Sequence, residues 1–285
     1  MALSLHKEVR QVGKKETASL IYHDIFDYPL TVAELIHWQA GKNVINHRSL
    51  IINHKKGFYY LKGREGNILK RLAREKTSVK KIKTAQLAGT VLARIPMVKM
   101  VGITGALAMK SADKDSDIDL MIIASKGTLW TTRLLVYCLL LFVGFKLRRA
   151  GVKDQKDKLC LNMWFDESDL IWRRRNIFTA HEIAQIVPIV NKNNTYEKLL
   201  QKNRWILEYW PKSVGIKNYE LGIRESKRRF AIIHYSLFII RLIELFAFKV
   251  QYRYMRSKIT REVVTPTRAV FHPFDWSKHI KARWF

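Results

Sequence analysis

This chain of 285 residues contains little cysteine. Its two cysteines, Cys138 and Cys160, lie in apolar runs and lack metal-ligand spacing. These features exclude a disulfide framework and a zinc site built on cysteines, so we expect both thiols to be reduced core residues of a cytoplasmic protein. The first residues, MALSLHKEVRQVGKK, contain no apolar segment of the length found in signal peptides.

Acidic residues are also scarce. Asp and Glu together number 24 against 52 Lys and Arg, which gives a net charge of +28. A surplus of this size indicates an anionic partner, which could be nucleic acid, a nucleotide or an anionic membrane face. A generally basic proteome or a need for solubility is the alternative explanation.

The chain has no long apolar run that is free of charge. The apolar stretch 134–145 is too short to cross a bilayer, and we expect a buried helix there. The stretch 230–248 is long enough but contains His234, Arg241 and Glu244. Since Arg241 and Glu244 are three residues apart, they share a helix face and can pair. We therefore expect a buried or partner-facing helix and no membrane span.

Residues 1–66 show the order of a winged-helix-like domain: three helical segments and a small aromatic ribbon. Thr31 and Glu34 have the spacing of a capping box that begins a helix over 32–39. The third helix and the wing would offer basic side chains to nucleic acid: His47, Arg48, His54, Lys55, Lys56, Lys62 and Arg64. A packing or dimerisation module is the alternative interpretation.

The rest of the chain divides into three further regions. Residues 67–94 predict one basic linking helix, which either contacts nucleic acid or presents a solvated face. Residues 95–172 alternate between strand and helix patterns, which indicates an α+β domain with a mixed sheet. Residues 173–285 are predicted to be mainly helical. Within them, His181 and Glu182 lack a second ligand at metal spacing, so core or surface roles are expected.

Four acids are concentrated in the segment SADKDSDIDLMII, which spans 111–123. On a strand, Asp117 and Asp119 project from one side while Ile118 and Leu120 enter the core. Two carboxylates on one face repel each other unless a cation lies between them. Hard oxygen ligands suit Mg²⁺ or Mn²⁺, and such ions also bind phosphate oxygens.

Gly105 follows an apolar strand predicted over 100–104, and it precedes Asp117 by twelve residues. Glycine at such a turn allows backbone N–H groups to approach a phosphate closely. A helix starting near Ala106 would direct its N-terminus to the same place. The sequence therefore predicts a phosphate-binding turn beside a metal site.

The segment VGITGALAMKSADKDSDIDLMII resembles the signature of the nucleotidyltransferase superfamily that includes DNA polymerase beta. Thr104-Gly105-Ala106 matches the glycine turn, and Asp117-Ile118-Asp119-Leu120 matches the acidic strand. The resemblance implies a Mg²⁺-dependent transfer of a nucleoside monophosphate from an NTP to a hydroxyl, with Asp117 and Asp119 as catalytic metal ligands. The charge favours RNA as the acceptor. We assign nucleotide binding to six residues: Thr104, Gly105, Ala106, Lys110, Ser116 and Asn162.

Two features depart from the family pattern. Ala106 replaces a frequent serine, and Asn162 stands where a third carboxylate is usual. Asp166 lies about 13 Å further along the strand, and Asp157 precedes the strand. Two alternatives therefore stay open: a catalytically degenerate domain that acts as a nucleic-acid-binding or regulatory module, and a small-molecule nucleotidyltransferase of the antibiotic-modifying type.

Overall fold

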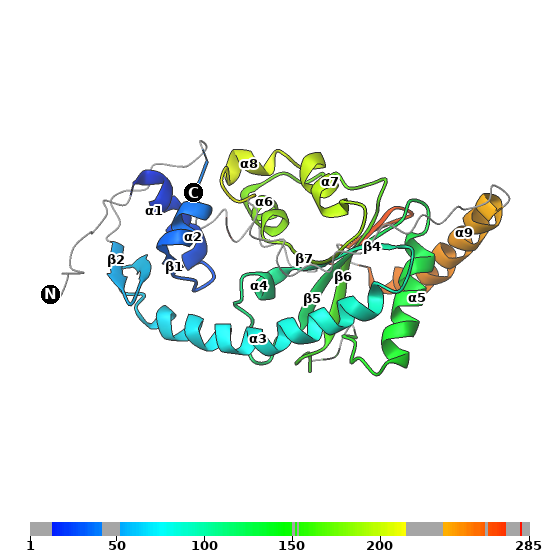
Figure 1. Ribbon diagram of the computed structural model, residues 1–285, viewed down its shortest axis with the longest axis horizontal. Coiled ribbons are helices and arrows are strands. Elements are labelled where there is room, and N and C mark those ends of the chain that lie inside the picture. Colours follow the sequence, from blue (N-terminus) through cyan, green and yellow to red (C-terminus); the bar gives the residue numbers. More distant parts are fainter. Residues whose placement is uncertain are drawn as a thin grey trace.

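The computed structural model describes residues 13–41, 52–149, 152, 154–214, 236–259, 262–271 and 280. A small N-terminal module and a larger mixed sheet lie at the two ends of one long helix (Figure 1). Helices cover both faces of the larger sheet. The protein therefore has the expected α+β architecture.

The N-terminal module combines two helices with a three-stranded sheet in the order β1-β3-β2. Its elements are α1 (Lys14–Asp24), β1 (Leu30–Thr31), α2 (Val32–His37), β2 (Ile52–Lys55) and β3 (Phe58–Leu61). The Thr31 side chain accepts a hydrogen bond from the Glu34 backbone and the Glu34 carboxylate binds the Thr31 backbone, so the predicted capping box is confirmed. The expected third helix, with His47 and Arg48, falls in 42–51, outside the described residues, while His54 and Lys55 lie on β2.

Helix α3 (Gly66–Leu92) confirms the predicted linking helix. Its 27 residues span about 40 Å at 1.5 Å per residue. Arg71 of α3 anchors the module to this helix. Its side chain is only 5% exposed, and it pairs with Glu34 at 2.7 Å and with Glu75 at 2.9 Å. Because a buried guanidinium requires such partners, the module and α3 are joined by a specific polar contact.

The larger sheet has six strands in the order β7-β4-β5-β6-β9-β8. The pair β5 and β6 is parallel, and the other neighbouring pairs are antiparallel. The strands are β4 (Val98–Ile103), β5 (Ile118–Ala124), β6 (Leu159–Asp166), β7 (Val187–Asn191), β8 (Val263–Thr265) and β9 (Arg268–Val270).

Residues 173–285, predicted to be mainly helical, also contribute strands to the larger sheet. They contain α6 (Ile177–Ala184), α7 (Thr195–Lys202), α8 (Ile206–Tyr209) and α9 (Ser236–Met255), but they also supply β7, β8 and β9. The expected boundary at residue 172 therefore cuts through one sheet. Pro188 helps to explain the misreading, because proline is tolerated in an edge strand such as β7 yet weakens a strand prediction.

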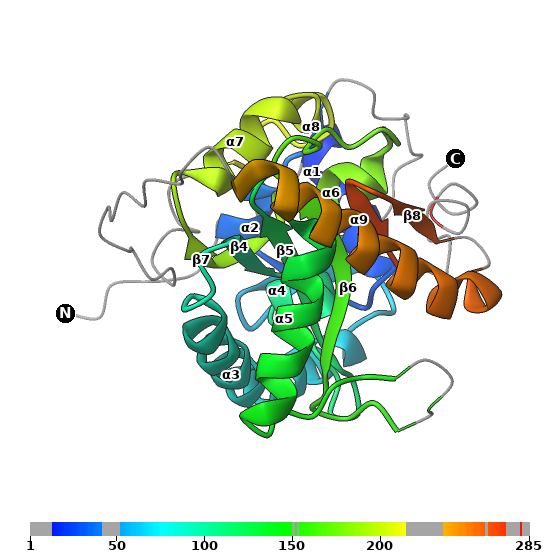
Figure 2. The same cartoon turned by 90° about the vertical axis from the view of Figure 1, so that its right-hand side faces the viewer.

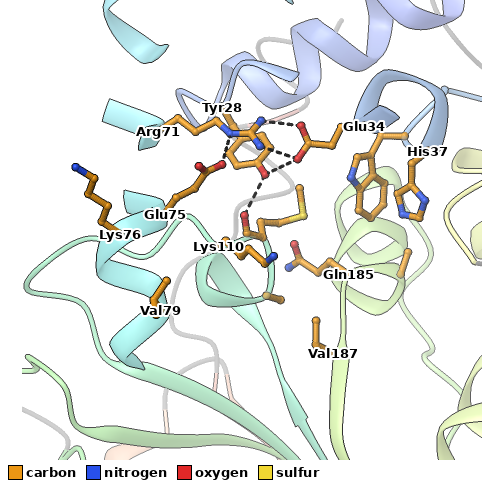
Figure 3. A pocket seen from close by; sticks show the side chains of 14 residues that line it. Tyr28, Glu34, His37, Arg71, Glu75, Lys76, Val79, Lys110, Gln185 and Val187 are labelled. Carbon is orange, nitrogen blue, oxygen red and sulfur yellow. Dashed lines mark hydrogen bonds and ion pairs between the residues drawn. The ribbon is translucent and has the colours of Figure 1, made fainter. Parts of the chain in front are cut away.

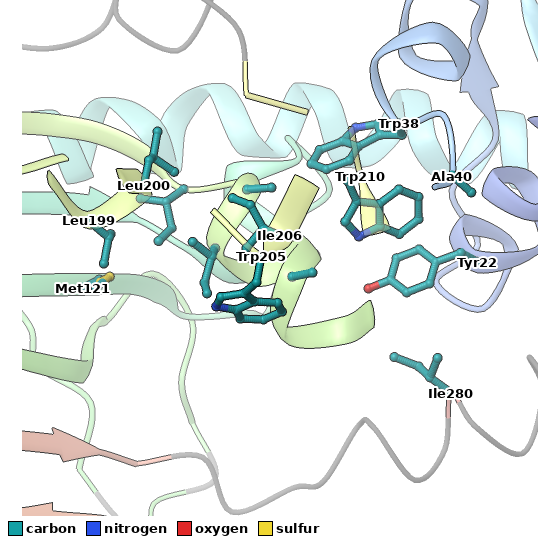
Figure 4. Close-up of a cluster of buried hydrophobic side chains, with 14 of the residues drawn as sticks. Tyr22, Trp38, Ala40, Met121, Leu199, Leu200, Trp205, Ile206, Trp210 and Ile280 are labelled. Carbon is teal, nitrogen blue, oxygen red and sulfur yellow. The ribbon is translucent and has the colours of Figure 1, made fainter. Parts of the chain in front are cut away.

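The two faces of the sheet have separate apolar cores. On the first, which we call the α5 face, α3, α5 (Leu129–Phe142) and α9 cover the strands, and Figure 2 shows α5 and α9 in front of the sheet. On the second, the α6 face, α6, α7, α8 and the N-terminal module pack against Met121 and Phe165. Figure 4 shows how Tyr22 and Trp38 of the module meet Trp210 on this face, with ring centroids 5.0 and 5.8 Å from that of Trp210.

The apolar stretch 134–145 is less buried than expected, and the stretch 230–248 was expected to be buried or partner-facing. In α5, Val136 and Leu140 are buried, whereas Phe142 is 89% exposed and Cys138 is also exposed, so Cys138 is not a core residue. In α9, Glu244 does not pair as predicted but accepts hydrogen bonds from the backbone at the start of α5, at Trp130. Among the described residues, no helix has both the length and the apolar character that a membrane crossing requires.

Candidate active site

Asp117 and Asp119 come together at the start of β5. Strand alternation turns Ile118 and Leu120 into the core of the α5 face, which leaves the two aspartates on the α6 face. Carboxylate oxygens of both residues and the Cys160 sulfur all lie within 4.8 Å of one another. Two acids and a thiol this close form a cluster that can coordinate a cation.

Gly105 brings the backbone directly against this cluster. It begins the short helix α4 (Gly105–Ala108) with φ of +60°, a conformation that favours glycine. A Cβ atom at this position would lie 2.7 Å from Oδ2 of Asp119. The glycine is therefore required twice, by its dihedral angle and by the nearby carboxylate. The predicted helix at Ala106 exists, but four residues give it little dipole.

Strand β6 adds Cys160 and Asn162 beside the aspartates. Cys160 is the direct partner of Asp119 in the parallel ladder, and the register shifts just beyond it so that Asn162 is the extra residue of a bulge. The Asn162 amide donates to Oδ1 of Asp119 at 2.6 Å, while its own Oδ1 is buried without a hydrogen-bond partner. Bulges often re-aim side chains next to active sites, and here the bulge directs an amide at the acid pair.

Arg148 supplies a positive charge to the cluster. It lies in the segment between α5 and β6, and its guanidinium reaches Oδ2 of Asp117 at 3.0 Å and the Cys160 sulfur at 3.3 Å. No motif marks this residue, because only the fold brings the segment over the acids. Arg148 therefore partly neutralises the acid pair in the protein alone.

The environment of Asp119 disfavours its charge. Burial and the neighbouring Asp117 carboxylate raise the pKa of Asp119 to about 7, although Cys160 and Arg148 act in the opposite direction. Two acids that share a site are expected to behave in this way. A divalent cation between them would remove the repulsion and restore the ionised form.

Helix α3 holds the acidic loop (residues 111–117) that leads into β5. Arg74 pairs with Asp113 at 2.7 Å, and Ser78 accepts a hydrogen bond from the loop backbone. The Lys81 ammonium, almost fully buried, donates to the Ser116 carbonyl at 2.6 Å. The three α3 side chains are three or four residues apart and so share one helix face. This line of contacts, which we call the α3 seam, fixes the loop ahead of the aspartates.

A cavity of about 540 Å³ opens over the aspartates on the α6 face. Its lining includes Gly105, Asp117, Asp119 and Asn162, as well as Glu182 from α6. Burial raises the pKa of Glu182 to about 8, and the Asp119 charge adds to this effect. The sequence placed Glu182 in the core or on the surface, because the spacing of α6 says nothing about which strand it faces. The fold makes Glu182 a further carboxylate of the cavity that contains Asp117 and Asp119.

Two buried histidines border the same cavity. His23 Nδ1 donates to the Ser19 carbonyl at 2.8 Å, so its Nε2 accepts from His181 Nε2 at 3.2 Å. Burial lowers the pKa of His23 to about 4 and that of His181 well below its ordinary value. Both rings are therefore neutral near pH 7. For His181 the structure confirms the expected core role.

The other predicted residues occupy separate positions. Thr104 has a buried hydroxyl without a hydrogen-bond partner, and the Ser116 hydroxyl donates to the Asp113 carbonyl rather than facing the cavity. Ala106 lines the cavity, whereas Lys110 lines a neighbouring one. The two substitute acids are engaged elsewhere: Asp157 pairs with Lys81, and Asp166 accepts hydrogen bonds from Gly127 and Ser168.

The neighbouring cavity, of about 580 Å³, lies between the N-terminal module, α3 and α6. Figure 3 shows Arg71 held there between Glu34 and Glu75. Tyr28, Met109 and Gln185 line both cavities, so the two adjoin. Together they form a cleft between the module and the larger sheet.

The structure of this chain alone shows the aspartate pair, the glycine turn and the acidic cavity. No protein-family model matches the chain, and no match to it was found among curated proteins or solved structures.

Proposed function

We propose that this protein is a Mg²⁺- or Mn²⁺-dependent nucleotidyltransferase that moves a nucleoside monophosphate from an NTP to a hydroxyl acceptor, with RNA as the favoured acceptor. The single observation that carries the proposal is the meeting of Asp117 and Asp119 against the Gly105 turn, inside a cavity of about 540 Å³. Pockets of this size accommodate small-molecule ligands.

The donor atoms fit a hard divalent cation. Asp117 and Asp119 offer carboxylate oxygens, and the buried amide oxygen of Asn162 has no hydrogen-bond partner. Oxygen donors of this kind are those that Mg²⁺ and Mn²⁺ prefer. Asp117 and Asp119 would hold the ion, which would neutralise triphosphate charge and polarise the reacting phosphate.

The reaction also requires a proton acceptor. The acceptor oxygen forms a bond to the α-phosphorus, the bond from that phosphorus to the bridging oxygen breaks, and pyrophosphate leaves. Among the acids that line the cavity, Asp27 and Asp113 are paired with cations, which leaves Glu182 beside the metal-binding pair. We assign the hydroxyl proton to Glu182, whose pKa of about 8 suits proton exchange near neutral pH.

Basic side chains along the cleft support an RNA acceptor. Arg74 lines the first cavity, and Lys76 and Lys110 line the second, where both are exposed. Cations placed beside a phosphoryl-transfer site bind a polyanionic acceptor, and the affinity falls with salt as counterions are released. The net charge of +28 agrees with this choice.

The proposal is tested with each of four α-labelled NTPs, Mg²⁺ and total RNA, followed by sizing of the labelled product. We expect transfer by the wild type and loss of transfer in Asp117→Ala and Asp119→Ala. Asp115→Ala is the matched control, because Asp115 is an exposed acid of the same loop outside the cavity lining. Efficient transfer by the double variant at positions 117 and 119 would refute the site.

A degenerate domain that binds nucleic acid is the second candidate. It is favoured by one specific observation: both aspartates already have partners, Arg148 at 3.0 Å and Asn162 at 2.6 Å. If Mg²⁺ and NTP leave the melting temperature unchanged while RNA binds in a salt-dependent manner, this second function replaces the first.

A further inference from the structure

Helices α5 and α9 expose large apolar side chains at the end of the molecule opposite the N-terminal module (Figure 1). Phe142 is 89% exposed, Phe246 70% and Tyr254 71%. Exposed apolar patches are normally small in a monomeric protein, so several large exposed apolar side chains on two packed helices mark an interaction surface. We call it the α5–α9 surface, and it comprises Leu134, Phe142, Ile243, Phe246, Val250 and Tyr254.

Four of the exposed apolar residues of α9 share one helix face. Ile243, Phe246, Val250 and Tyr254 are separated by three, four and four residues, which is the spacing of an amphipathic stripe. Another side of α9 faces α5, where Gln251 donates to the Trp130 carbonyl at 2.8 Å. The apolar stripe is thus held outward by specific contacts on the inner side.

The solvent-exposed charges of α5 and α9 are all positive. Arg241, Lys249 and Arg253 of α9 are exposed. The sequence of α5 contains no acid, and the one acid of α9, Glu244, is turned inward to cap α5 at 2.6 to 2.9 Å. A cation-rimmed apolar face therefore points outward with no exposed carboxylate on either helix.

These features favour one kind of binding partner for the α5–α9 surface. A second copy of the chain would place the same cations against each other, and nucleic acid offers no apolar phase for Phe142 and Phe246. A lipid surface accepts apolar side chains at its acyl boundary, and anionic headgroups complement exposed Lys and Arg. We propose that the α5–α9 surface binds the interface of an anionic lipid membrane, without crossing it.

The proposal is independent of the catalytic one. The cavity with Asp117 and Asp119 lies on the α6 face, whereas α5 and α9 cover the opposite face of the sheet. A protein docked through α5 and α9 would keep its cleft in solution.

The test is sedimentation of the full chain with phosphatidylcholine vesicles and with vesicles that also contain phosphatidylglycerol. We expect binding to the anionic vesicles alone, weakened by salt. The double variant Phe142→Glu/Phe246→Glu should bind at least about tenfold more weakly, because burial of a phenyl side chain contributes more than one decade in affinity. Leu69→Glu is the matched control: Leu69 is 67% exposed on α3, away from this surface.

Charge is separated from apolar contact by Lys249→Glu/Arg253→Glu, with Lys76→Glu/Lys83→Glu on α3 as control. The first pair should lose about tenfold or more in affinity for anionic vesicles, and the second pair much less. Equal loss in both pairs would show a diffuse charge effect and overturn the proposal. A dimer in light scattering that dissociates in Phe246→Glu would also overturn it, because the surface would then join two copies.

Discussion

The two faces of the larger sheet are built differently. On the α5 face, Trp130 and Trp164 are fully buried in a mainly aliphatic core, with the Arg133 guanidinium 5.8 Å from each ring. On the α6 face, buried polar groups interrupt the core: His23, His181, Asn162 and, in the cavity, Glu182. The α6 face therefore places polar side chains, which are costly to bury, around its cavity.

The largest expected effect is a loss of folding stability in a variant of the α5 face. Trp164→Ala should lower the free energy of unfolding by about 3–5 kcal/mol, because it removes a fully buried ring and leaves a cavity. Urea denaturation measures this loss. Trp172→Ala, at a half-buried position against the α6-face core, should cost clearly less. Equal losses would contradict the expected dependence of the loss on burial.

An effect of intermediate size concerns the pKa of Asp119 on the α6 face. Because the pKa of Asp119 is about 7 in the folded state and 3.8 ordinarily, the folded state holds this proton more tightly. The Asp119 contribution to stability is therefore full below pH 4 and is lost as pH rises to about 7. Asp119→Asn should be more stable than the wild type at pH 8, by roughly 1–3 kcal/mol.

Denaturation between pH 4 and pH 8 tests this sign. The wild type should lose stability with pH more steeply than Asp119→Asn, and Glu182, with its pKa of about 8, maintains part of the slope in both. Asp115→Asn, at an exposed position, should follow the wild type. Parallel curves for the wild type and Asp119→Asn would show that folding does not raise the pKa of Asp119.

The smallest expected difference is between two glycine variants. Gly105 and Gly127 have φ of +60° and +71°, but an added Cβ meets Asp119 only at Gly105 and open space at Gly127. Both alanine variants should lose about 1–2 kcal/mol through the left-handed conformation. Gly105→Ala should lose about 1 kcal/mol more and should also weaken the stabilisation by Mg²⁺, seen as a smaller thermal shift. Identical behaviour of the two variants would show that the close approach of the Gly105 backbone to Asp119 does not contribute to the site.

Local patterns predicted much of this fold. The capping box of Thr31, the helix α3 and the strands β4, β5 and β6 follow from short-range signals, and alternation along β5 correctly placed Asp117 and Asp119 together. These features depend on neighbours in the sequence, which is why one chain suffices to predict them.

The remaining features depend on tertiary contacts. Strands β8 and β9 have three residues each; β9 exists because β6 pairs with it from about a hundred positions away, and β8 exists because it pairs with β9. Arg148 and Glu182 reach the aspartates from a loop and a helix without any motif, and the bulge at Asn162 changes the side-chain parity that strand alternation assumes. Residue spacing alone contains none of this information.

The α3 seam has a mechanical consequence. Arg71 fastens the N-terminal module, and Arg74, Ser78 and Lys81 fasten the acidic loop, all within three turns of one uninterrupted helix. A helix resists bending over so short a length, so the module and the loop cannot shift independently. A displacement of the module relative to the larger sheet would therefore also displace the loop that leads to Asp117 and Asp119.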